Sequence, residues 1–295
     1  MQTNKILTDT SMRELAEHGT PDFQFKYYYD DIQSFDNHCI DYHWHNEFEW
    51  CIIEKGTVEC VIGANSILLN EGDGIFINSK AIHCFKTDNG AIMPNILFSP
   101  EFISPEMSAI YSEYIKPILS SDCTYFVFRK TDKNNILSKL NQIFKLSESN
   151  TYPKMDIHID VCILWKDFVH ITNGYWSTQQ NKQSILLQAR TRTMMNFIAQ
   201  NHKNKITLSD IAASANISKS EALRCFNKEI NTTPVNYLID YRLKKAKEYL
   251  ISTNDTITQI ALNIGIDNVS YFVRLFTKKY DVTPKAFRMQ NRAVI

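Results

Sequence analysis

The chain has 295 residues, of which 44% are hydrophobic and 22% charged, a composition that excludes a disordered chain and favours a protein with a buried core. Its length favours two domains. The net charge of zero is unevenly divided. Residues 1–180 contain 14 Lys and Arg against 24 Asp and Glu, whereas residues 181–295 contain 18 against 8. The C-terminal part, with a net charge of +10, is therefore the part suited to a polyanion.

The cysteines and the N-terminal sequence favour a cytoplasmic protein. Seven cysteines, an odd number, are scattered without a Cys-x-x-Cys pair, which predicts reduced thiols rather than disulfides or a cysteine zinc site. The first 19 residues have no apolar core, so we expect no signal peptide. No stretch approaches the ~18–20 apolar residues of a membrane span, and we expect no membrane partner.

Residues 22–128 are predicted to form an antiparallel β-barrel. β-rich runs occur at Phe48–Ile53, Val58–Ile62, Gly74–Ile77 and Tyr125–Phe128, and five of the eight glycines lie between residues 56 and 90. Regular turns between short strands are typical of antiparallel barrels and sandwiches.

Ionisable side chains are concentrated in this barrel. His43 and His45 alternate along one strand and so lie on one face, and Glu49 shares their parity. With His83 on a later strand, four ligands suited to Fe, Mn, Ni, Cu or Zn can converge. Ionisable groups inside a barrel are costly unless something satisfies them, which indicates a site.

The spacing His43-x-His45-x3-Glu49-x6-Gly56, followed by Gly72-Asp73-x9-His83, resembles the two motifs of the cupin barrel over residues 38–90. The second motif lacks the usual Pro-x-Gly before its histidine. Three interpretations stay open: an effector pocket that binds a small polar ligand such as a sugar, a set of buried residues satisfied by local hydrogen bonds, and a metal site. The first uses Trp44 with the four ionisable residues, and Phe48, Trp50 and Phe76 are either pocket walls or core.

A helical segment is predicted at residues 129–180. Apolar residues recur at helical spacing from about residue 132, and a second helix is expected at about 155–172. Its main apolar stripe consists of Ile157, Val161, Leu164, Phe168 and Ile171. We expect this segment to mediate homodimerisation, because an apolar stripe must be covered; packing within one chain is the alternative. Residues 173–184 read as a polar linker.

The last part of the chain, residues 185–292, repeats itself with a period of 50 residues. The matched pairs are Arg224 and Arg274, Phe226 and Phe276, Pro234 and Pro284, and Tyr237 and Phe287, while Ile211-Ala212 matches Ile260-Ala261 at an offset of 49. Each copy predicts a helix-turn-helix whose second helix begins after an N-cap, Ser218 or Asn268. A long helix over 235–251 joins the copies and is suited to hold two recognition helices about 34 Å apart, in successive major grooves.

The stretch from ITLSDIAASANIS to TPKAFR resembles the DNA-binding domain of the AraC/XylS family over residues 186–290. The family usually has Gly at the positions of Asn231 and Asp281 and Phe at that of Ile266. Asn and Asp tolerate left-handed backbone, so a tight turn is still expected after each recognition helix.

The resemblance implies which residues contact DNA. The base-reading positions fall on Ser220, Leu223 and Arg224 in the first copy and on Val269, Ser270, Val273 and Arg274 in the second. Arginine suits guanine, and Leu or Val suits a thymine methyl. Lys219, Lys228, Lys278 and Lys279 are interpreted as phosphate contacts.

The resemblance also implies the function: a transcription regulator, by family habit an activator, that binds double-stranded DNA, acts with RNA polymerase and is controlled by an effector in an N-terminal cupin-like barrel. We expect no enzymatic activity and no cofactor. The alternatives are a metal-dependent cupin enzyme fused to a DNA-binding domain and a regulator that needs no effector.

Overall fold

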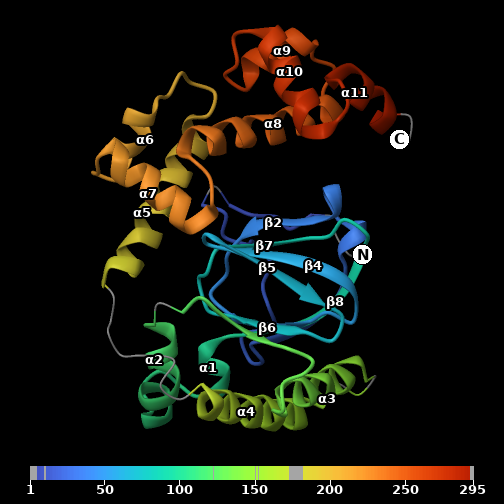
Figure 1. The fold of residues 1–295 in the computed structure, drawn as a ribbon, viewed down its shortest axis with the longest axis vertical. Coiled ribbons are helices and arrows are strands. Elements are labelled where there is room, and N and C mark those ends of the chain that lie inside the picture. The colour runs from blue at the N-terminus through green and yellow to red at the C-terminus, as the bar shows by residue number, and fades with distance from the viewer. Residues whose placement is uncertain are drawn as a thin grey trace. The chain divides into compact units, whose positions relative to one another are not determined.

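The computed structural model describes residues 5–9, 11–121, 123–149, 151, 153–172 and 182–292 (Figure 1). The chain divides into two units, Met1–Leu187 and Gln188–Ile295. The domain boundaries expected at residues 22, 128 and 185 stay predictions. No helix among the described residues is long and apolar enough to cross a membrane.

The N-terminal unit is built on antiparallel strands, as the sequence predicts. The strands are β1 Phe25–Asp31, β2 Cys39–His43, β3 Phe48–Ile52, β4 Lys55–Ile62, β5 Asn65–Asn70, β6 Gly74–Ile77, β7 His83–Lys86, β8 Ala91–Phe98 and β9 Tyr125–Phe128. Their order is β2-β7-β4-β8-β3-β6-β9, with β1 paired to β8 and β5 to β4. The strands therefore form the antiparallel sheet domain that the turn spacing predicts.

Alternating side chains of these strands enter two different cores. Cys51, Ile53 and Ile75 belong to an aliphatic core that also contains residues of β4, β5 and β7. Phe48 and Trp50, of opposite parity on β3, belong to an aromatic core on the other face. Glu49 has the parity of Cys51, so it shares the aliphatic side of the sheet.

Helices cover the aromatic face of the sheet, as Figure 1 shows for α3 and α4 below β6. The helices of this unit are α1 Pro100–Ile103, a π-helical turn Tyr111–Ile115, α2 Lys116–Leu119, α3 Ile136–Glu148 and α4 Lys154–Ile171. The ring of Trp165 stacks on Phe48 at 4.6 Å, and Phe168 meets Trp50 edge-on at 4.9 Å. Phe48, Trp50 and Phe76 are thus core residues, each fully buried, and not pocket walls.

The packing of α4 corrects the expectation for its apolar stripe. Ile157, Val161, Leu164 and Phe168 are completely buried within one chain, because the aromatic face of the sheet requires a cover. Ile171, the last member of the predicted stripe, is 42% exposed. The stripe is therefore intramolecular, and it does not supply a dimer interface.

The C-terminal unit is helical. Its helices are α5 Lys182–Asn201, α6 Leu208–Ser214, α7 Lys219–Ile230, α8 Pro234–Ser252, α9 Ile257–Asn263, α10 Val269–Tyr280 and α11 Pro284–Arg292. Residues 173–181 of the predicted linker lie outside the described residues, and residues 182–184, also predicted as linker, instead begin α5.

Both helix-turn-helix units have the caps that the sequence predicts. Ser218 and Asn268 accept hydrogen bonds from the third residue of α7 and α10, which satisfies backbone N–H groups that a helix start leaves free. Asn231 and Asp281 end these helices with φ of 49° and 55°. The left-handed backbone expected where the family has Gly is therefore present.

Helix α8 connects the two units of the repeat (Figure 1). Near its N-terminus, Tyr237 packs on Phe226 of α7 with ring centroids 5.5 Å apart. Towards its C-terminus, Leu243, Ala246 and Leu250 share a core with α9, α10 and α11. With 19 residues it is about 28 Å long. The proposed spacing of about 34 Å between recognition helices stays a prediction.

Candidate functional site: a buried histidine cluster and two DNA-facing helices

Four ionisable side chains meet inside the N-terminal unit. His43 ends β2, His83 begins β7, and the two residues pair across these strands. His45 follows β2, and Glu49 lies on β3. One potential ligand atom from each of the four lies within 4.8 Å of every other, and all four residues are at most 4% exposed. Their role in binding stays a prediction.

The carboxylate of Glu49 lies at the centre of the contacts. Its Oε2 atom is 2.9 Å from His83 Nε2 and 3.3 Å from His45 Nε2. Its Oε1 atom accepts a hydrogen bond from the Cys51 thiol at 3.3 Å. One oxygen is thereby held by the thiol, and the other faces the imidazoles.

A main-chain carbonyl fixes each imidazole ring. The Nδ1 atoms of His43, His45 and His83 lie 2.8, 3.2 and 3.0 Å from the carbonyl oxygens of Asp41, Glu47 and Ala81. A carbonyl oxygen accepts and does not donate, so each Nδ1 carries the proton. The Nε2 atoms are the atoms left to face the centre of the cluster.

The pKa values of His43 and Glu49 are both lowered in the cluster, which favours the neutral form of His43 and the charged form of Glu49. Burial lowers the pKa of His43 to about 3, assisted by the neighbouring His83. Burial acts to raise the pKa of Glu49, but the imidazoles of His83 and His45 hold it well below its ordinary value. Glu49 is therefore a carboxylate at neutral pH, and His43 is a neutral imidazole.

An N-terminal segment, residues 11–18, lies over the cluster. The Glu14 carboxylate oxygen Oε2 is 3.9 Å from His43 Nε2 and 3.3 Å from His18 Nε2. The His18 ring meets the His45 ring edge-on at 5.4 Å. Sequence reasoning missed Glu14 and His18, because the contact joins an irregular segment to a distant strand and no local pattern marks it.

Trp44, predicted to line an effector pocket, is not brought into the cluster. Its indole Nε1 donates to the carbonyl of Ser11 at 2.9 Å. Its backbone N–H donates to Met12, and its carbonyl accepts from Glu14. Trp44 thus holds the N-terminal segment against the end of β2.

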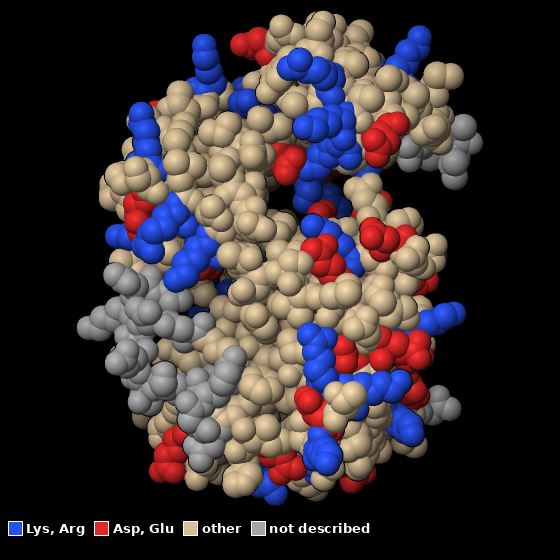
Figure 2. Space-filling view, viewed as in Figure 1, with Lys and Arg blue, Asp and Glu red and all other residues tan. Residues whose placement is uncertain are grey.

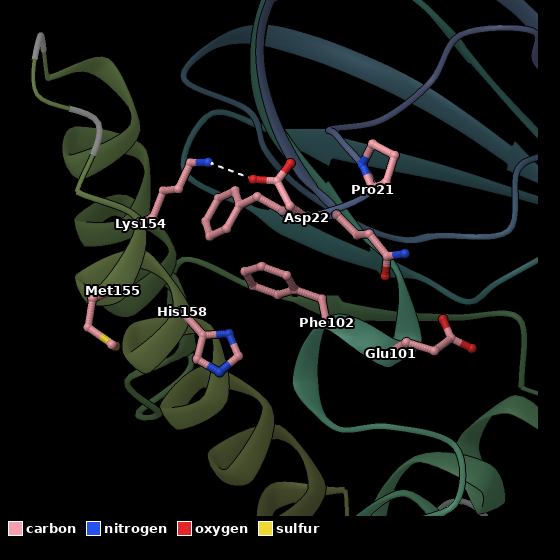
Figure 3. Close-up of a pocket in the computed structure, with 9 residues that line it drawn as sticks. Pro21, Asp22, Glu101, Phe102, Lys154, Met155 and His158 are labelled. Carbon is pink, nitrogen blue, oxygen red and sulfur yellow. Dashed lines mark hydrogen bonds and ion pairs between the residues drawn. The ribbon is translucent and has the colours of Figure 1, made fainter.

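A separate groove of about 530 Å³ lies outside the sheet, between residues 21–24, α1 and α4. Figure 3 shows Phe102 and His158 facing one another across it, with the ion pair of Lys154 and Asp22, 3.3 Å long, at its edge. None of the four clustered residues lines this groove. It therefore does not account for the buried cluster.

The predicted base-reading residues lie on the first turns of α7 and α10. Five of them are exposed: Ser220, Leu223, Arg224, Ser270 and Arg274. Val269 and Val273 are half-buried against the core of the second helix-turn-helix copy. The lysines Lys219, Lys228, Lys278 and Lys279 are exposed on the same helices. Figure 2 shows Lys and Arg side chains gathered over the C-terminal helices.

Two of these basic side chains have acidic partners. The Arg224 guanidinium makes two hydrogen bonds to the Glu221 carboxylate, of 2.8 and 2.7 Å. Lys279 forms an ion pair with Asp240 of α8. Arg274 lies over the ring of Tyr271, 5.4 Å from its centroid. Any DNA phosphate or base that engages Arg224 must compete with Glu221.

Comparison with known proteins decides the family. A family model described as an AraC-like ligand binding domain matches residues 32–152, and one described as a helix-turn-helix domain matches residues 211–290. The uncharacterized HTH-type transcriptional regulator YdeC of Bacillus subtilis (strain 168) is 30% identical over 292 residues, which cover 97% of this chain and 99% of YdeC. The chain belongs to the AraC family of transcriptional regulators.

Two further matches have lower identity. The HTH-type transcriptional activator RhaS of Yersinia pestis (strain Pestoides F) is 20% identical over 249 residues, 84% of this chain and 89% of RhaS. The crystal structure of ToxT from Vibrio cholerae O395 has 13% identity and a TM-score of 0.41, and the match covers 90% of this chain and 97% of ToxT. The two family models, and not these weaker matches, assign this AraC-family regulator an N-terminal ligand-binding domain and a C-terminal helix-turn-helix domain.

Helix α7 of this regulator contains a buried acid that sequence reasoning did not single out. Burial raises the pKa of Glu229 to about 7, although Lys228 and Arg192 lower it in part. Glu229 is 8% exposed. Ionisation of this carboxyl therefore opposes folding at neutral pH.

We expect Glu229→Gln to stabilise the protein at pH 8 by roughly 2–3 kcal/mol and at pH 5 by less than about 1 kcal/mol. Because the folded pKa of about 7 exceeds the unfolded value, wild-type stability falls as pH rises from about 4.5 to 7, and glutamine has no such loss. Urea unfolding at the two pH values measures the difference. An equal effect of the substitution at pH 5 and pH 8 would contradict the assignment.

Proposed function

We propose that this regulator is a cytoplasmic transcription activator, and not an enzyme, whose helices α7 and α10 enter successive major grooves of double-stranded DNA. The observation that carries the proposal is the repeated geometry: two capped helices, each with an exposed arginine on its first turns. They lie in residues 181–295, which have a net charge of +10. A helix N-terminus suits a phosphate group, and an arginine side chain suits guanine. RhaS is named as an activator, which supports activation, and we propose that this regulator acts with RNA polymerase.

The proposed control is a small effector that binds in the N-terminal barrel at His43, His45, Glu49 and His83. Buried ionisable groups are costly without a partner, so these residues fit a site for a polar ligand such as a sugar or a small acid. A ligand changes transcription when it binds one conformation of the regulator better than another. Its binding to the sensor is thus expected to alter how the regulator presents α7 and α10.

We also propose a homodimer, through a surface other than the buried stripe of α4. Met155 and Ile159, one turn apart on the same helix, are 71% and 47% exposed. Neighbouring apolar side chains on a helix surface favour association. Sedimentation of wild type and of a Met155→Glu, Ile159→Glu variant tests this face: the variant should sediment as a monomer, and a dimeric variant contradicts the proposal.

DNA binding is tested by selection from a random duplex library with the full chain, followed by footprinting. We expect an enriched element of two half-sites about 10 base pairs apart. We also expect an affinity that falls steeply as salt rises, because lysines and arginines release counterions from the phosphates. Failure to enrich any sequence, with salt-independent binding, would remove the proposed function.

The effector site is tested with a reporter gene under the selected element, in cells grown on a panel of sugars and small organic acids. Replacement of both His45 and Glu49 by Ala should abolish the response and leave DNA affinity unchanged. The matched control is His158→Ala in the groove of Figure 3, which should respond normally. A double variant that keeps its response while His158→Ala loses it would place the effector in the groove instead.

A further inference from the structure

A third charged side chain joins the contact between Arg224 and Glu221. Arg190 of α5 donates from Nη1 to Oε1 of Glu221 at 3.1 Å. The same oxygen accepts from Arg224 Nη2 at 2.7 Å, and Oε2 accepts from Arg224 Nε at 2.8 Å. One carboxylate of α7 is therefore shared by an arginine of its own helix and an arginine of α5.

Helix capping explains the position of Glu221, but it does not explain the contact with Arg190. The Ser218 hydroxyl accepts a hydrogen bond from the Glu221 N–H at 3.2 Å, and a carboxylate in the first turn interacts favourably with the helix dipole. Both effects are complete within α7. Arg190 lies 31 residues earlier in the chain, so its contact is a tertiary one that adds a second positive charge to the carboxylate.

The three side chains together have one net positive charge. The hydrogen bond from Arg224, assisted by the charges of both arginines, holds the pKa of Glu221 below its ordinary value, so Glu221 is ionised at neutral pH. The side chain of Arg224 is 49% exposed, against 30% for Arg190 and 23% for Glu221. Arg224 is therefore the member that can turn towards DNA, and the pair that it leaves behind is neutral.

We propose that Arg190 is a positioning residue for DNA recognition, which neutralises Glu221 when Arg224 leaves it to contact a base. The inference rests on the proposed function, because it requires that α7 enters the major groove. Without Arg190, the release of Arg224 would leave an unpaired carboxylate beside the DNA phosphates, and charge repulsion would oppose binding. With Arg190 in place, Oε1 of Glu221 keeps a hydrogen bond and the DNA meets a neutral pair.

The second copy of the repeat provides an internal comparison. Tyr271 occupies the position that corresponds to Glu221, and the first turn of α10 contains no acidic residue. Arg274 lies over the Tyr271 ring, and its transfer to a base leaves no carboxylate behind. The role of Arg190 is thus confined to the half-site that α7 reads.

The test is a set of anisotropy titrations of the full chain on the duplex that wild type enriches from a random library. Arg190→Gln should lower the affinity by roughly two- to fivefold, the equivalent of one partly exposed ion pair, and most strongly at low salt. Arg190→Lys should keep most of the affinity. In a Glu221→Gln background, Arg190→Gln should cost no more than the loss of one surface charge, because no carboxylate is left to neutralise.

Base preference separates positioning from an effect on folding. Two single-base variants of the duplex are compared, one changed at the base pair that Arg224→Ala no longer discriminates and one changed at the base pair that Arg274→Ala no longer discriminates. Arg190→Gln should weaken discrimination at the first base pair and leave it unchanged at the second. A loss of fold would instead affect both, and it would lower the melting temperature of the variant without DNA.

The control is Lys203→Gln, which removes a positive charge from an exposed residue just after α5. Its effect on affinity should be the same in wild type and in the Glu221→Gln background. If wild type binds the duplex and Arg190→Gln equals it in affinity and base preference, the inference is overturned and the proposed function stands. Equal losses from Arg190→Gln with and without Glu221→Gln overturn it too. A wild type that binds no duplex removes both the inference and the proposed function.

Discussion

Arg274→Ala should lower the affinity for the selected DNA element by roughly 5- to 150-fold, the equivalent of about 1–3 kcal/mol for a bidentate contact to a base. Arg224→Ala should cost less, although its position in the repeat is the same. In the free protein Arg224 makes two hydrogen bonds to Glu221, and DNA binding must replace them. Arg274 has the weaker contact with the Tyr271 ring.

Glu221→Gln should have the opposite effect on DNA affinity. This substitution removes a negative charge beside the DNA-facing arginine and frees Arg224, so affinity should rise by roughly two- to fivefold. Anisotropy titrations on the selected element and on single-base variants measure all three substitutions. Lys228→Ala is the control: as a phosphate contact it should weaken all sequences equally and flatten the salt dependence. Unchanged base preference in both arginine variants would contradict the assigned reading positions.

Gly265→Ala should destabilise the protein by roughly 2–5 kcal/mol, a large part of the 5–15 kcal/mol typical of a domain. Gly265 has φ +78°, where a Cβ atom is strained, and that atom would lie 2.5 Å from the carbonyl oxygen of His202 and 2.8 Å from Arg242 Nη2. Arg242 donates to the carbonyls of His202 and Asn204 at 2.8 Å each. The added methyl group would therefore disturb the hydrogen bonds by which Arg242 of α8 holds the residues after α5, next to the turn between α9 and α10.

Asn216→Ala is the matched control, because Asn216 occupies the corresponding turn in the first copy with φ 54°. It already has a Cβ atom, so alanine there should cost only about 1 kcal/mol. Urea unfolding compares the two variants, and footprinting of the Gly265→Ala protein should show weaker protection of one half-site. Equal urea midpoints for Gly265→Ala and wild type would show that the turn adapts without cost.

The correct fold predictions all rest on local patterns. The recurrence of Ile-Ala, of an N-cap and of Arg and Phe at fixed spacing predicts two helix-turn-helix units, because caps and helical periodicity act over a few residues. The expectation that His43, His45 and Glu49 share one strand is wrong, because His43 ends β2, His45 follows that strand and Glu49 lies on β3. The two copies differ by one residue in the turn. In the first copy Asn216 and Ile217 directly precede the N-cap Ser218, whereas in the second copy one more residue lies between Ile266 and the N-cap Asn268.

The sequence by itself determined the antiparallel barrel, the helical repeat and the residue types that meet in the cluster, since periodicity and parity are properties of the chain. The tertiary structure decided which surfaces are covered. An apolar stripe on α4 predicts only that something packs on it, and the aromatic face of the sheet, formed by Phe48 and Trp50 far away in sequence, is what does so. In the same way, long-range packing placed Glu14 over His43 and directed Trp44 to the N-terminal segment. Contacts between distant segments depend on how the elements assemble, and no local pattern contains that information.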